Sequence, residues 1–298
     1  MNLPAEIRRR SMMNCRRDLR PDLNPAQGLD IGPRFPRTHL LMTFPVYNEA
    51  LRLQQTLRTV SATLQRAGID FDMAVAEDGS TDGTREVILE LLREFPSLIV
   101  QSLPDRCGRG FALRRLWGSV EADIYMFSDV DLAAGEEALL RVIHLAESGH
   151  MIVTGSRYVG GASVNRPPTR HLVSRFYNLL ARMWFSEDIQ DHQCGLKAFR
   201  AEAIKDLLPL CREDSWAWDT EVLVLASRTG YLVTEVPVSW TEHRVRRTPW
   251  LRLLSDIWLH GTALMRLKGD LPSRLRVRHG NNRSHPSDET IPDASNHT

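Results

Sequence analysis

Apolar and polar residues alternate along residues 39–156 in blocks that predict strands and helices in turn. Short apolar runs of strand length occupy residues 39–44, 71–76, 98–100, 125–128 and 151–154. Between these runs, apolar residues recur every three to four positions, which is the period of a helix with one buried face. Strands that alternate with helices are typical of a mostly parallel, doubly wound α/β sheet. The pattern therefore predicts an α/β fold with polar loops at the ends of its strands.

The pattern is less regular in the second half of the chain. A helix is expected around residues 172–184, and a last strand over Tyr231–Val238. Over residues 249–268, apolar residues that include two tryptophans recur at helical spacing, with several Arg and Lys residues around them. Such a basic amphipathic helix is compatible with lying on a membrane surface and with packing on its own domain. The sequence leaves both readings open.

The two ends of the chain lack periodicity. Residues 1–37 are rich in Arg, Pro and Asn, and residues 269–298 are polar and rich in Ser, Asn and His. Segments with so little apolar surface to bury are expected to be disordered. The expected organisation is a basic arm over 1–37, one α/β domain over 38–248, an amphipathic helix over 249–268 and a polar tail over 269–298.

Composition narrows the function classes. The 298 residues are 42% hydrophobic and 25% charged, with a formal net charge of +1. This is ordinary globular composition, and its near-neutral charge gives no electrostatic reason to expect nucleic acid as a partner. Four cysteines show neither C-x-x-C spacing nor the density of a disulfide framework, which favours a reducing, cytoplasmic location. No run reaches the about 18 apolar residues of a membrane-spanning helix.

Two carboxylates follow the strand expected at residues 125–128. In extended backbone, Asp129 and Asp131 would leave the same face, with their Cα atoms roughly 7 Å apart. Open α/β sheets bind ligands at the carboxyl ends of their strands. Two carboxylates there suit a divalent cation such as Mg²⁺ or Mn²⁺, which also takes phosphate oxygens from a substrate. Asp-x-Asp alone is equally compatible with a solvated turn.

Polar loops follow the other expected strands as well. Tyr47 and Glu49 follow the first strand, and Asp78 follows the second. A Gly/Arg loop with Arg109 opens a helix after the third strand, where backbone amides and the helix dipole can hold anionic oxygens. Further along, Trp216 and Trp218 stand beside two acidic residues, Asp219 and Glu221. The two tryptophans are expected either to pack in the wall of the domain or to form a platform for the substrate. His192 and Cys194 lack further ligands at zinc spacing.

Seven segments, taken together and in order, resemble the family-two nucleotide-sugar glycosyltransferases with the GT-A fold, a Rossmann-like arrangement. Within that family they look most like the polyprenyl-phosphate branch, the dolichyl-phosphate glucosyl- and mannosyltransferases. The resemblance covers roughly residues 39–245 and departs from the family pattern at Glu77, at Cys107 and over residues 243–247. The matching segments are Pro45–Glu49, Asp78–Thr84, Asp129–Leu132, Gly155–Arg157, Cys194–Phe199, Trp218–Glu221 and Glu235–Val238.

The resemblance implies an inverting hexosyltransferase with a nucleotide-sugar donor, UDP-glucose or GDP-mannose, and a polyprenyl (dolichyl) phosphate acceptor. Asp129 and Asp131 would hold Mg²⁺ or Mn²⁺ and the ribose-diphosphate part of the donor. Arg157 and Arg170 are the candidates for the acceptor phosphate, because guanidinium pairs bidentately with such oxygens. The remaining donor-binding candidates are Pro45, Tyr47, Glu49, Asp78 and Arg109, with Asp78 on the edge of the base.

The role of Asp219 depends on the acceptor. A phosphate monoester, with a second pKa near ~6, is largely ionised at neutral pH and attacks without a strong base, so Asp219 would orient the reactants. With a soluble or polysaccharide hydroxyl acceptor, Asp219 would be the general base. A non-catalytic sugar-nucleotide-binding regulator is a third interpretation. The protein is expected to be cytoplasmic and peripheral on the membrane face, through the helix over 249–268, and its oligomeric state is not indicated.

Overall fold

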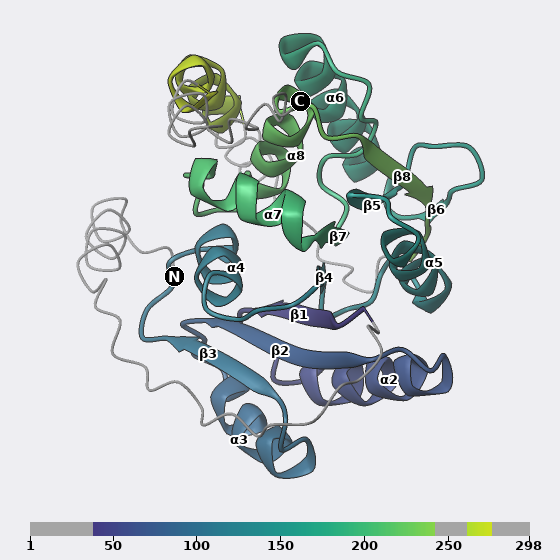
Figure 1. The fold of residues 1–298 in the computed structure, drawn as a ribbon, viewed down its shortest axis with the longest axis vertical. Coiled ribbons are helices and arrows are strands. Elements are labelled where there is room, and N and C mark those ends of the chain that lie inside the picture. Colours follow the sequence, from purple (N-terminus) through teal and green to yellow (C-terminus); the bar gives the residue numbers. More distant parts are fainter. Residues whose placement is uncertain (1–37, 242–260, 276–298) are drawn as a thin grey trace, which may run out of the picture.

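A seven-stranded sheet crosses the protein in the computed structural model, which describes residues 38–241 and 261–275 (Figure 1). The strand order is β3-β2-β1-β4-β7-β5-β8. Every pair in this sheet is parallel except the two that β7 makes with β4 and β5. Its strands are β1 (Leu40–Val46), β2 (Phe71–Asp78), β3 (Ile99–Leu103), β4 (Ile124–Ser128), β5 (Ile152–Ser156), β7 (Leu196–Arg200) and β8 (Val233–Pro237).

Helices cover both faces of the sheet, because neighbouring residues of its central strands point to opposite sides. In β4, Tyr125 and Phe127 join one buried cluster, whereas Ile124 and Met126 join the other. The first cluster lies under α4 (Arg109–Trp117), α6 (Pro168–Phe185), α7 (Ala201–Leu207) and α8 (Trp218–Arg228). The second lies under α2 (Leu53–Arg66), α3 (Thr84–Glu94) and α5 (Glu136–Glu147). The predicted doubly wound α/β fold is confirmed.

Three strands were not expected from the sequence pattern. The antiparallel β7 inserts between β4 and β5, although it follows both of them in the chain. Two short strands, β6 (Ser163–Asn165) and β9 (Ser239–Thr241), pair in parallel as a separate two-stranded sheet. The hydrophobic pattern of β7 is interrupted by Lys197, a charged residue that the fold buries completely.

The helix described over residues 261–275 packs on its own domain. Leu264, Leu267 and Leu271 are buried in the cluster under α8, and Arg274 forms a buried ion pair with Glu221 of α8. Residues 269–275 are helical, so the expectation that the polar tail begins at residue 269 is wrong for this stretch. The expected arm over 1–37, the expected helix over 249–260 and the tail from 276 lie outside the described residues.

Within the described ranges, no helix combines the length and the apolar character that crossing a bilayer requires.

Candidate active site

Pairing between β1 and β4 stops short of their carboxyl ends, where the strand order of the sheet reverses, and we call the space at this switch point the crevice. Pairing between these strands ends at Thr43 and Phe127, whereas β1 continues along β2 as far as Val46. Pro45 lies in this continuing part of β1, beyond its last residue paired with β4. The chain runs from β1 outward to β2 and β3 and returns to the other side of β1 with β4. Such a reversal of strand order is where open α/β sheets bind ligands.

Two loops on one side of the crevice are tied together by Asn48. Its backbone N–H donates to Ser80 Oγ at 3.0 Å, and its Oδ1 accepts from the Thr81 N–H at 2.8 Å. Asn48 adopts a left-handed φ of 57°, which Asn tolerates better than most residues. The neighbouring Tyr47 ring lies under the Arg106 guanidinium at 3.9 Å, and the Glu49 N–H donates to Thr84 Oγ1 at 2.9 Å. Glu49 is thus positioned by the loop after β2, and Tyr47 by Arg106 of the loop after β3.

The Asp78 carboxylate is buried at the end of β2. It accepts the backbone N–H groups of Cys107, at 2.7 Å, and Gly108, at 2.9 Å. Burial raises the pKa of Asp78 to about 6, and these two N–H donors oppose that increase. The adjacent Glu77 is fully buried and accepts hydrogen bonds from the Ser80 N–H and the Ser102 hydroxyl. Glu77 therefore shapes the loop, whereas Asp78 joins it to the start of α4.

Asp129 and Asp131 lie on a turn rather than on extended backbone. β4 ends at Ser128, and the Leu132 N–H donates to the Asp129 carbonyl at 3.1 Å, which closes a four-residue turn. The expected extended arrangement of this pair is therefore wrong. Burial is the main cause of a rise in the Asp129 pKa to about 6; the Arg109 charge opposes this rise, and the charge of Asp131 adds to it. Leu132 has a left-handed φ of 47°, a strained conformation for an L-residue that is often found at functional sites.

Gly195 lets Asp129 lie directly against β7. The Asp129 N–H donates to the Gly195 carbonyl at 2.9 Å. A Cβ atom added to Gly195 would stand 1.9 Å from Asp129 Oδ2, far inside van der Waals contact. Glycine is thus required here by the close approach of a carboxylate rather than by its backbone angles.

Arg109 connects the two acidic parts of the site. Its Nη1 lies 3.0 Å from Asp129 Oδ1 and 3.5 Å from Asp219 Oδ2. The guanidinium is stacked between the rings of Phe127 and Trp216, with 4.7 and 4.4 Å to their centroids. It is almost fully buried, and none of its three nitrogen atoms has a hydrogen-bond partner of good geometry among the described residues. Buried donors rarely stay unsatisfied in proteins, so this arginine is suited to receive an anionic ligand.

Lys197 completes the charged cluster and is a residue that the sequence analysis did not single out. Its side chain is fully buried, donates to the Cys194 carbonyl at 2.6 Å and lies 3.5 Å from Asp219 Oδ1. Asp219, in the first turn of α8, therefore has a cation on each of its oxygens. The only sign in the sequence that Lys197 is a site residue is its position in the run from Gly195 to Phe199, whose other residues are small or apolar.

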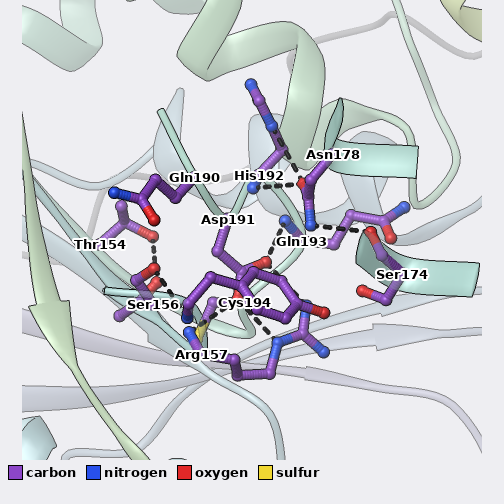
Figure 2. Close-up of polar contacts among 12 residues, drawn as sticks. Thr154, Ser156, Arg157, Ser174, Asn178, Gln190, Asp191, His192, Gln193 and Cys194 are labelled. Atoms are coloured by element: carbon purple, nitrogen blue, oxygen red, sulfur yellow. Dashed lines mark hydrogen bonds and ion pairs between the residues drawn. The ribbon is translucent and has the colours of Figure 1, made fainter. Parts of the chain in front are cut away.

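Arg157 has a different partner from the one expected. Its guanidinium donates to both oxygens of Asp191, each at 2.7 Å, and its backbone N–H donates to Asp191 Oδ2 at 3.0 Å (Figure 2). Both residues are buried, and Asp191 raises the pKa of Arg157 further against the effect of burial. The structure pairs the Arg157 guanidinium with Asp191 in the loop before β7, and the role of Arg157 at an acceptor phosphate stays a prediction. Arg170 lies half-buried in the first turn of α6, and its role stays a prediction.

The remaining candidates divide between core and surface. Trp218 is completely buried and packs edge-on against Trp117, whereas Trp216 is 50% exposed over Arg109. Trp218 is thus wall packing, and Trp216 remains available as a platform. His192 is buried, and one of its ring nitrogens lies 3.1 Å from Asn178 Oδ1 (Figure 2). The other ring nitrogen contacts the Glu187 carboxylate, so both metal-binding positions of the ring are engaged.

The site fits a divalent cation that is shared with a substrate. Asp129 and Asp131 supply hard oxygen donors at the crevice, beside an arginine with unused N–H groups. No group of three or more His, Cys, Asp or Glu side chains is arranged for a metal within the described residues. Mg²⁺ is typically held in this way, through one or two carboxylates with substrate phosphates and water as its other ligands.

Solved structures share this fold. Glucosyl-3-phosphoglycerate synthase from Mycobacterium tuberculosis, in complex with Mn²⁺, UDP-glucose and phosphoglyceric acid, superposes with a TM-score of 0.61 at 20% identity. The match covers 78% of this chain and 80% of that one. The complex of the same enzyme with UDP has a TM-score of 0.58 at 18% identity. At this level of identity the likeness shows the GT-A, Rossmann-like fold.

Sequence relatives give the family. Glycosyltransferase AglD of Haloferax volcanii is 35% identical over 79% of this chain, which spans 38% of that protein. The dolichyl-phosphate β-glucosyltransferases of Trichomonas vaginalis (ALG5A) and Saccharomyces cerevisiae are 30% and 26% identical over 68% of the chain, and the matches cover 66% and 67% of those proteins. The model of "Glycosyl transferase family 2" matches residues 43–208, which contain Asp78, Arg109 and Asp129. The chain belongs to glycosyl transferase family 2.

Proposed function

We propose that this chain is a metal-dependent, inverting hexosyltransferase that uses a nucleotide diphosphate sugar and a polyprenyl (dolichyl) phosphate. The observation that carries the proposal is the buried Arg109 guanidinium, which is held by Asp129 and Asp219 and has unused N–H groups at the crevice. A diphosphate supplies the oxygens that such a group requires. The names of the sequence relatives support dolichyl phosphate as the acceptor.

The nucleoside would lie on the side of the crevice formed by the loops after β1 and β2. Tyr47 offers an aromatic edge that is fixed by Arg106, and the Asp78 carboxylate lies at the base of this side. Pro45 and Glu49 complete the expected contacts. Asp129 and Asp131 would hold Mg²⁺ or Mn²⁺, and a bound cation neutralises the charge that develops on a departing diphosphate. Arg109 contributes to the same stabilisation from the protein side.

Asp219 is proposed to orient the reactants when the acceptor is a phosphate. Cations lie 3.5 Å from each of its oxygens, so the carboxylate is fixed by two ion pairs. An acceptor phosphate is largely ionised at neutral pH and can attack the anomeric carbon directly, with inversion. Arg157, which Asp191 holds in place, and Arg170, in the first turn of α6, are the proposed ligands of that phosphate. We place the reaction at the cytoplasmic face of a membrane.

A soluble acceptor is the second candidate. The fold neighbour from Mycobacterium tuberculosis was crystallised with phosphoglyceric acid, a small water-soluble molecule. With a hydroxyl acceptor, Asp219 would become the general base. A sugar-nucleotide-binding regulator without activity is disfavoured by the charged cluster of Arg109, Asp129, Lys197 and Asp219, since buried charges are costly to keep.

The test is transfer of radiolabelled sugar from UDP-glucose and from GDP-mannose into solvent-extractable lipid. Vesicles that contain polyprenyl phosphate are supplied with Mg²⁺, and Asp131→Asn is the matched control. Label in the lipid that requires Mg²⁺ and is lost in the variant supports the proposal and identifies the donor. Donor hydrolysis without lipid label would favour the soluble acceptor. Binding of neither donor would contradict both candidates.

A further inference from the structure

The outward face of α6 is apolar. Leu172, Phe176, Leu179 and Met183 are 50–69% exposed, and they follow one another at intervals of three or four residues. With about 100° between successive residues, these four side chains fall within an arc of about 60° on the solvent side of the helix. We call this set the α6 stripe. A surface helix normally turns such a stripe toward the core, so its exposure requires a partner.

The α6 stripe cannot turn inward, because the opposite face of the helix is fixed by buried polar contacts. The Tyr177 hydroxyl lies 2.7 Å from Thr220 Oγ1, on the helix that carries Asp219. Asn178 donates to the Ser174 carbonyl and accepts the His192 N–H at 3.0 Å (Figure 2). The outer face of α6 and the candidate active site are therefore joined through one rigidly oriented helix.

Every charged side chain between Arg157 and Glu187 is basic. This segment, which contains all of α6, has no Asp or Glu, and Arg175 is exposed on one flank of the stripe. His171 lies among these charges, since Arg175 and Arg166 add to the effect of burial in lowering its pKa. On the other flank, Lys268 of the helix over 261–275 lies 5.8 Å from the Trp184 ring. The remaining basic residues of the segment are Arg170 and Arg182.

An apolar stripe beside the exposed cations Arg175 and Lys268 complements a bilayer with anionic headgroups. A second copy of the chain is a poorer match. A two-fold contact through the α6 stripe would bring the basic segment of one copy against the same basic segment of the other, and like charges disfavour association.

We propose that α6 docks this protein on anionic membrane surfaces, with the α6 stripe inserted at the level of the headgroups. This assigns membrane contact to a different element from the helix over 249–268. In the described part of that helix, residues 261–268, Leu264 and Leu267 are already buried against the domain. Docking through α6 would bring the active site to a lipid acceptor, and in this respect the inference rests on the proposed function. Docking itself is measured without any sugar transfer, so it can be tested independently.

The experiment is co-sedimentation of the full chain with vesicles of phosphatidylcholine alone and of phosphatidylcholine with phosphatidylglycerol. The test variant is Phe176→Ser/Leu179→Ser. The matched control is Leu89→Ser/Leu232→Ser, since these leucines are 62% and 78% exposed on other parts of the surface. Thermal unfolding of all proteins shows whether the variants keep the fold. We expect the wild-type protein and the control to bind the anionic vesicles, and the test variant to bind about tenfold less for each apolar side chain lost.

A charge variant, Arg175→Gln, should weaken binding to anionic vesicles and leave binding to phosphatidylcholine unchanged. Equal binding by the test variant and the control would overturn the proposal. The proposal would also be overturned if the test variant lost self-association but kept vesicle binding. That result would make the α6 stripe an interface between copies of the chain. Sugar transfer to a short-chain, water-soluble prenyl phosphate separates the two proposals. The test variant should retain this transfer activity. If the wild-type protein lacks the activity, the result counts against the proposed function alone.

Discussion

Asp129 occupies the space that a side chain on Gly195 would need. The carboxylate Oδ2 lies 1.9 Å from the position of a Gly195 Cβ, while the backbones of the two residues are joined by a hydrogen bond of 2.9 Å. The carboxylate that is proposed to hold the metal and diphosphate is thus positioned by β7, although these residues are far apart in the chain.

Gly195→Ala should therefore disable the site while leaving the fold intact. The added methyl group displaces the Asp129 carboxylate by about 1 Å or more, and a misplacement of that size costs about 100-fold in rate. Steady-state transfer rates at saturating donor and Mg²⁺ test this. Gly160→Ala is the control, because a Cβ there would meet nothing within 4 Å. Equal rates for the two variants would contradict the assigned role of Asp129.

Arg157→Met should destabilise the protein. Removal of the guanidinium leaves the buried Asp191 carboxylate without its bidentate partner, and breaking such a pair costs about 3–5 kcal/mol. Urea unfolding followed by circular dichroism gives the change in the free energy of unfolding. A variant of wild-type stability whose only defect is a raised KM for the acceptor would support the original phosphate-binding interpretation instead.

Lys197 and Asp219 should show strong coupling in a double-mutant cycle. Lys197→Met leaves Asp219 with only Arg109 as a cation, and its expected cost is about 3 kcal/mol, because one buried partner is removed. Asp219→Asn should also be destabilising. The double variant should lose less than the sum of the two single variants, since no unpaired charge of this pair remains. If the losses in the free energy of urea unfolding were additive, the 3.5 Å contact between Lys197 and Asp219 would contribute nothing to stability.

The free energy of unfolding should rise as the pH falls through about 6. The folded pKa of Asp78 is about 6, above its ordinary value of 3.8. Between these two values, the folded state binds a proton that the unfolded state releases. Stability therefore increases by up to about 1.4 kcal/mol per pH unit on acidification, and the gain is complete below pH ~4. Donor binding should weaken over the same range if it requires the ionised carboxylate.

Asp78→Asn isolates this contribution. The amide oxygen can still accept the N–H groups of Cys107 and Gly108, which both lie within 2.9 Å of Asp78 Oδ1, but the side chain no longer titrates. The slope of unfolding free energy against pH between 7 and 5 should be flatter in this variant than in the wild-type protein. Identical slopes would show that another group is responsible.

The parallel half of the sheet could be predicted from the sequence, because its strands are continuous apolar runs that are followed by polar loops. β7 could not be predicted in this way, since the burial of Lys197 depends on Asp219 and on the Cys194 carbonyl. In addition, β7 pairs with β4, which lies far from it in the sequence. The carboxylate pair of Asp129 and Asp131 was recognised by residue type, but the end of β4 at Ser128 and the turn after it are not visible in the local pattern.

Site residues whose partners come from distant parts of the chain were harder to predict. Arg157 has the right chemistry for a phosphate, and only the fold shows that Asp191 already occupies it. Arg109 illustrates the reverse case. A Gly/Arg loop is common on protein surfaces, whereas in this fold the guanidinium is buried between Phe127 and Trp216. The residue types were informative, but their burial was decided by tertiary structure.

The insertion of β7 between β4 and β5 has a consequence for synthesis on the ribosome. The edges of β4 and β5 that β7 later joins have no partner strand until residues 196–200 leave the exit tunnel. Unpaired strand edges are templates for association between chains. Nascent or truncated chains that stop before Leu196 should therefore be clients of chaperones and prone to aggregate, even though they contain Asp78, Arg109 and Asp129. The segment that lies against the Asp129 carboxylate therefore also joins the two parts of the sheet late in translation.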